Sequence, residues 1–69
     1  MKKRLVTNLK DYRLKKEISQ QELADLVNVR RETIIRLEKG EYNPSLQLAM
    51  DIAKVFNVSI EDIFSSEER

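Results

Sequence analysis

The sequence predicts an all-α fold, a compact domain of five short helices that occupies residues 1–69. Apolar residues recur at spacings of three and four in successive segments, which is the period of amphipathic helices. The chain has one glycine and one proline, so it carries little of the turn chemistry that an all-β fold needs. With 41% hydrophobic and 36% charged residues, its composition is that of one small globular domain rather than a disordered segment.

The composition excludes several classes of function. The chain has no cysteine and no histidine, which excludes disulfides, Cys/His metal sites and catalysis by imidazole. It has no glycine-rich loop and no converging pair of carboxylates, so an enzyme is the weakest interpretation, and we expect no cofactor and no small-molecule ligand. No apolar run is long enough for a signal peptide or a membrane span, so we expect a cytoplasmic protein that does not bind membranes.

Charge is distributed unevenly along the chain. Residues 1–40 hold eleven Lys/Arg and six Asp/Glu, a balance of +5, and residues 41–69 hold two and six, a balance of −4. The two sum to the net charge of +1. A basic face for a polyanion would explain this asymmetry, and so would uneven scatter in a small protein.

The first helix is expected over residues 8–17. Leu9, Tyr12 and Arg13 fall there at i, i+3 and i+4, on one face of a helix. A basic arm, residues 1–6, precedes it. Three arrangements of the arm remain open: disorder, extension of the first helix, or a short β pairing with the other end of the chain near Phe64.

A capping box starts the second helix. Ser19 and Glu22 have the spacing at which side chain and backbone cap each other, so the helix should begin at Gln20 and run for about two turns. Its apolar face is expected to hold Leu23, Leu26 and Val27.

A tight turn should join the second helix to a third. Asn28 tolerates the left-handed conformation that ends a helix abruptly, and few residues then remain before the next periodic segment. The third helix is expected over about residues 31–39, with Ile34 and Leu37 facing inward. Gly40, the only glycine, stands where the left-handed residue after a helix belongs.

Two more helices follow. Ser45 is placed to open a helix over residues 46–56, and Ser59 and Asp62 are spaced to cap a last short turn before a polar tail, residues 65–69. The apolar residues at helical spacing in these segments are Leu48, Ala49, Ile52, Ala53, Phe56, Ile60, Ile63 and Phe64.

The segment QQELADLVNVRRETIIRLEK, residues 20–39, resembles the helix-turn-helix of the phage repressor and Cro family, also called the xenobiotic response element family. SQQELA, RLEKGEYNPSL and IAKVFNVSIEDIF also look like segments of this family, so the resemblance covers roughly residues 5–64. It implies a lambda-repressor-like fold and a sequence-specific DNA-binding transcriptional regulator. The matching residues of the helix-turn-helix are Ala24, Val27, Val29, Ile34 and Leu37.

The chain departs from the family pattern at two positions. Asn28 stands in the turn, where the family often has glycine, and it satisfies the same conformational requirement. Arg30 stands where the family usually has a serine or threonine that caps the recognition helix. The cap of the third helix is therefore unexplained.

The resemblance implies which residues contact bases. The family's base-reading positions fall on Arg31, Glu32 and Arg36, with Ile35 between them. Arginine can bond guanine O6 and N7, a carboxylate can accept from cytosine N4, and an aliphatic side chain can pack on a thymine methyl. Glu32 has two open roles, because it could read a base or orient a neighbouring arginine through an ion pair on its own helix.

Other residues are expected to contact the DNA backbone or to stabilise the fold of the protein. The basic residues 2–4 would add attraction to DNA that does not depend on its sequence. Tyr42 has two open roles, because it could contact a phosphate or pack on the proline loop. The family's buried pair between the first helix and the end of the third matches Arg13 and Glu38. Candidate phosphate contacts are Gln20, Arg30, Lys39, Tyr42 and Asn43.

The expected partners are double-stranded DNA and a second copy of the chain. Family members usually bind a pseudo-palindrome as homodimers, since one small domain contacts few bases. The rival interpretation is a protein-interaction module such as an antitoxin component. The residues expected at a dimer interface, which could instead close the core of the single chain, are Phe56, Val58, Ile60, Ile63 and Phe64.

Overall fold

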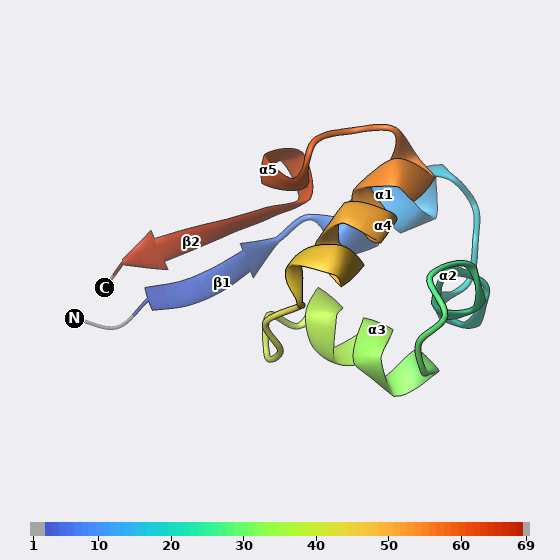
Figure 1. Cartoon of the computed structure of the whole chain (residues 1–69), viewed down its shortest axis with the longest axis horizontal. Helices are drawn as coiled ribbons and strands as arrows, with labels where there is room; N and C mark the ends of the chain where they lie inside the picture. Colours follow the sequence, from blue (N-terminus) through green and yellow to red (C-terminus); the bar gives the residue numbers. More distant parts are fainter. Residues whose placement is uncertain (1–2, 69) are drawn as a thin grey trace.

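The structure, a computed structural model, describes residues 3–68. Figure 1 shows the helices gathered in one body, from which the terminal strands extend as a ribbon. The five predicted helices are confirmed, and of the three arrangements left open for the arm the structure has the short β pairing near Phe64. In chain order the elements are β1 (Lys3–Thr7), α1 (Leu9–Lys15), α2 (Gln20–Leu26), α3 (Arg31–Glu38), α4 (Leu46–Phe56), α5 (Ile60–Ile63) and β2 (Phe64–Glu68).

The two ends of the chain form an antiparallel ribbon. Its register places Thr7 opposite Phe64 and Lys3 opposite Glu68, so the basic arm and the polar tail pair within one chain. The pairing continues into the body, because the backbone N–H of Asn8 donates to the carbonyl of Ile63 over 2.8 Å. The ribbon therefore joins the start of α1 to the end of α5.

Short polar side chains define where three helices begin. Ser19 Oγ accepts from the backbone N–H of Glu22 at 2.9 Å, and Glu22 Oε1 accepts from the backbone N–H of Ser19 at 2.7 Å. Ser59 and Asp62 form the same reciprocal pair before α5, and Ser45 caps α4. The capping boxes predicted from the sequence are confirmed. At the start of α3, Arg30 is extended and provides no side-chain hydrogen bond.

Four helices end in a residue with a left-handed backbone. The φ angles are 59° at Glu17, 58° at Asn28, 74° at Gly40 and 56° at Asn57. This confirms the roles predicted for Asn28 and Gly40. Gly40 has a second constraint, because a Cβ there would lie 2.8 Å from the carbonyl oxygen of Leu5 in β1. Any other residue would both strain the turn and displace the strand.

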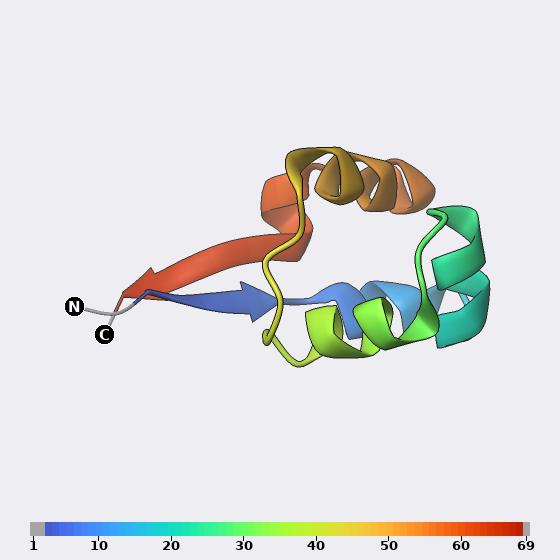
Figure 2. The same cartoon turned by 60° about the horizontal axis from the view of Figure 1, so that its bottom comes forward.

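The core lies between two layers of helices. Figure 2 shows α4 on one side, α1 and α3 on the other, and α2 closing one end. Leu26 was expected to share the buried face of α2, but it is 60% exposed. Its position is 60° from Leu23 around the helix, and the core side is instead occupied by Ala24. The buried apolar residues are Leu9, Leu23, Ala24, Val27, Ile34, Leu37, Leu48, Ala49, Ile52, Ala53, Ile63 and Phe64.

The residues expected at a dimer interface differ in their exposure within the single chain. Ile63 is 1% exposed and Phe64 is 7% exposed within the single chain, so neither offers area to a second copy. Both were expected at a dimer interface, and within the single chain they belong to the core. Phe56, Val58 and Ile60 pack against the core but remain partly exposed.

Within residues 3–68, no helix has both the length and the apolar character needed to cross a bilayer.

Candidate nucleic-acid interface

Helix α3 has one buried and one exposed face. Ile34 and Leu37 are fully buried against the core, while Arg31 and Arg36 point to solvent. Ile35 is partly exposed, so the two adjacent isoleucines serve different faces. The four residues expected to read bases, which include Glu32, thus lie on the accessible side of α3.

A buried ion pair fixes the end of α3 to α1. Arg13 Nε donates to Glu38 Oε2 over 2.6 Å, and Arg13 Nη2 donates to Glu38 Oε1 over 3.3 Å. The two side chains are only 9% and 5% exposed. Arg13 Nη1 also donates to the carbonyl of Ile18 at 3.0 Å. Burial of both charges is tolerable because each finds several partners.

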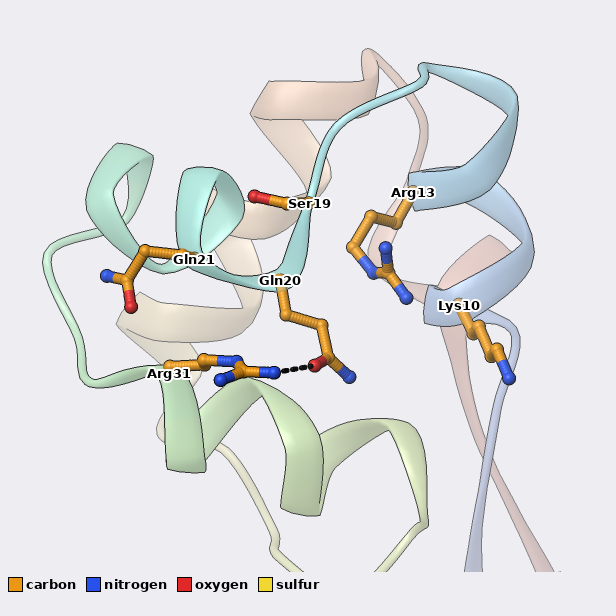
Figure 3. A pocket seen from close by; sticks show the side chains of 6 residues that line it. All are labelled: Lys10, Arg13, Ser19, Gln20, Gln21 and Arg31. Carbon is orange, nitrogen blue, oxygen red and sulfur yellow. Dashed lines mark hydrogen bonds between the residues drawn. The ribbon is translucent and has the colours of Figure 1, made fainter.

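Gln20 connects this ion pair to the exposed face of α3. Its Nε2 donates to Glu38 Oε1 over 3.1 Å, and its Oε1 accepts from Arg31 Nη2 over a long 3.5 Å. Chemistry fixes this orientation, since a flipped amide would place oxygen against the carboxylate and NH₂ against the guanidinium. Among the described residues, one of the two amide hydrogens has no acceptor, and Gln20 Oε1 faces Arg31 (Figure 3).

A basic pocket lies where α1, α2 and α3 meet. Figure 3 shows the amide of Gln20 between Arg31 on one side and Arg13 and Lys10 on the other. Among the described residues that line the pocket, three are cationic and none is acidic. Lys10 and Gln21 were missed by sequence reasoning. Lys10 lies on the exposed side of α1, and no local pattern indicates that packing brings it beside α2.

The end of α3 and the loop after it form a second local cluster. The guanidinium carbon of Arg36 lies over the ring of Tyr42, 5.8 Å from its centroid. Lys39 and Asn43 are exposed nearby in sequence, and Arg30 is exposed at the opposite end of the helix. Three of the residues expected to contact phosphates, Arg30, Lys39 and Asn43, are thus exposed before and after α3.

Comparison with known proteins agrees with this arrangement. The helix-turn-helix family matches residues 9–63. An uncharacterized HTH-type transcriptional regulator of Archaeoglobus fulgidus is 60% identical over 62 residues, which are 90% of this chain and 87% of that protein. The restriction-modification controller protein C.AhdI from Aeromonas hydrophila superposes with a TM-score of 0.71 at 28% identity, covering 78% of this chain and 82% of its own.

The transcriptional regulator VanUg shares the whole fold, with a TM-score of 0.80 at 24% identity over 100% of this chain and 92% of its own. The family match spans all five helices. The chain belongs to the helix-turn-helix family of DNA-binding transcriptional regulators.

Proposed function

We propose that the protein binds a pseudo-palindromic operator as a homodimer, with α3 of each copy in the major groove. The observation that carries the proposal is the division of α3 into a braced inner face and an accessible outer one. Each half-site would be read by Arg31, Glu32, Ile35 and Arg36. The protein would act in the cytoplasm, where its operator lies.

The chemistry of the outer face suits base edges. Arg31 and Arg36 can each donate two hydrogen bonds to a guanine, and Ile35 can pack on a thymine methyl. In the part of the chain that the structure describes, Glu32 forms no ion pair. This supports acceptance from cytosine N4 over the alternative in which Glu32 orients an arginine.

Phosphates would be held at the two ends of α3. The basic pocket offers Lys10 and the free amide hydrogen of Gln20, and Arg30 lies exposed just before the helix. Lys39 and Asn43 are exposed after it. These contacts would give sequence-independent affinity and set the orientation of α3 in the groove.

A second copy is expected to cover the partly exposed apolar residues at the end of α4 and the start of α5. Phe56, Val58 and Ile60 remain as candidates, because Ile63 and Phe64 are buried in the core of the single chain. Light scattering at tens of micromolar should give a dimeric mass. A monomeric mass at that concentration would contradict this part of the proposal.

The function is tested by selecting bound DNA from a random pool at two salt concentrations. We expect a palindromic motif, whereas no enrichment and a salt slope explained by charge alone would favour a protein-interaction module. Arg31→Ala should then cost about 1–3 kcal/mol at one base position and relax specificity there. Lys54→Ala removes an exposed cation in the last turn of α4 and is the matched control. Equal losses on operator and random DNA would make Arg31 a phosphate contact.

A further inference from the structure

We propose that Tyr42 is a positioning residue for Arg36, whose guanidinium it holds in place for base reading. This inference rests on the proposed function of α3. The guanidinium carbon lies over the Tyr42 ring at 5.8 Å from its centroid, within the distance at which the ring quadrupole attracts a cation. Tyr42 is 39% exposed, so its ring is a surface feature and not part of the core.

The backbone of the loop fixes where the ring can be. The N–H of Gly40 donates to the carbonyl of Leu37 at 3.1 Å, and that of Glu41 donates to the carbonyl of Arg36 at 2.9 Å. These two bonds and the left-handed Gly40 form a Schellman motif. Arg36 is thereby tied through its own carbonyl to the residue that precedes Tyr42.

The chain beyond Tyr42 is restricted as well. Pro44 limits the backbone of the residue before it to extended conformations. Only Asn43 separates Tyr42 from this proline. The aromatic ring is therefore held from both sides of the loop, and Arg36 finds it at a fixed place beside the helix.

Arg36 gains most from such a support. An exposed arginine samples many rotamers, and ordering it on DNA costs conformational entropy. Arg31 has an acceptor on Gln20, at 3.5 Å. Among residues 3–68, no hydrogen bond or ion pair holds the side chain of Arg36, and Tyr42 is the contact that remains.

Holding by the ring and reading of a base do not compete. The five N–H donors of a guanidinium lie in its plane, where they reach guanine O6 and N7. The Tyr42 ring attracts the guanidinium through its π face and accepts no strong hydrogen bond, so the N–H donors of Arg36 stay available. This role needs the aromatic ring, whereas a phosphate contact by Tyr42 needs the hydroxyl group.

Two substitutions separate ring from hydroxyl, measured as dissociation constants on the selected operator. Tyr42→Phe keeps the ring and should bind within about 2-fold of the wild type, whereas Tyr42→Leu should bind about 3- to 10-fold more weakly. The loss of affinity caused by Tyr42→Leu should vanish on an operator altered at the base pair whose recognition Arg36→Ala abolishes. It should also vanish when Tyr42→Leu is combined with Arg36→Ala. Melting temperatures would show that each variant is folded.

Other outcomes overturn the proposal in distinct ways. Equal losses for Tyr42→Phe and Tyr42→Leu on all sequences would make the hydroxyl a phosphate contact. Unchanged binding by Tyr42→Leu would show that the ring contributes nothing, while the operator itself would still support the proposed function. If the wild type enriches no motif, the proposed function fails and the role of Tyr42 fails with it.

Discussion

Helices α2 and α3 are nearly equal in length but are held in different ways. Helix α2 has seven residues and starts with a reciprocal cap between Ser19 and Glu22. Helix α3 has eight residues and starts at Arg31, and Arg30 at its N-cap provides no side-chain hydrogen bond. Its support comes from buried Ile34 and Leu37 and from the bonds of Glu38 to α1 and α2. The start of α2 is fixed by a local cap, whereas α3 has no such cap and depends on contacts across the fold.

Both helices depend on the rest of the fold, but through different contacts. Isolated helices of seven or eight residues are unstable in water, so each needs an external source of stability. In α3 that source is its inner face and its last turn. Substitutions on the exposed outer face are therefore expected to leave the fold intact.

Removing Glu38 should break the support of α3 and have the largest effect. Glu38→Ala leaves Arg13 buried without its carboxylate and should cost about 3–5 kcal/mol. For a domain of this size, such a loss lowers the melting temperature by more than about 10 °C. Thermal unfolding followed by circular dichroism measures it.

A double replacement is the control for this prediction. Combining Arg13→Met with Glu38→Leu removes both charges and keeps most of the volume, so much of the stability should return. The support of α3 would not depend on the pair if Glu38→Ala melted within a degree or two of the wild type.

The same difference explains what the sequence could predict. Capping boxes and left-handed Asn28 and Gly40 are local signals, so the helix boundaries followed from spacing alone. The partnership of Arg13 with Glu38 came from the resemblance to a family, because 25 residues separate them. The positions of Lys10 beside α2 and of Tyr42 beside Arg36 depend on tertiary packing, which the spacing of residues in the sequence does not indicate. Leu26 is exposed because Ala24, and not Leu26, occupies the core side of α2.

Removing the local cap should weaken α2 by a smaller amount. Ser19→Ala leaves the N–H of Glu22 without its side-chain acceptor and should cost about 1 kcal/mol. Urea unfolding gives the difference, and Ser65→Ala, at an exposed serine in β2, is the matched control. Equal midpoints for the two variants would mean that α2, like α3, is held by tertiary contacts.

Adding a cap to α3 should make the two helices more alike. Arg30 already has the extended backbone of a capping residue, so Arg30→Ser should stabilise the fold by about 0.5–1 kcal/mol. Arg30→Ala removes the same charge without adding an acceptor, and the difference between the two variants isolates the cap. If Arg30 contacts a phosphate, both variants should also lose affinity uniformly across DNA sequences and reduce the salt slope by about 1.

The smallest effect is expected at Glu17, which ends α1 in a left-handed conformation with φ of 59°. Glycine adopts this conformation without strain but loses more backbone freedom on folding, so Glu17→Gly should gain a few tenths of a kcal/mol, up to about 1. Lys16→Gly, at a residue with φ of −83°, gains no relief of strain and should destabilise. Differential scanning calorimetry compares the two.

The turn at Glu17 matters because of the residue that follows it. Ile18 donates its N–H to the carbonyl of Arg13 at 3.3 Å and accepts from Arg13 Nη1 at 3.0 Å. The left-handed residue thereby brings a carbonyl to the guanidinium that holds α3 through Glu38. If Glu17→Gly stabilises the wild type but not the Glu38→Ala variant, the turn acts through the ion pair. An equal gain in both would make it a local feature of α1, comparable to the cap of α2.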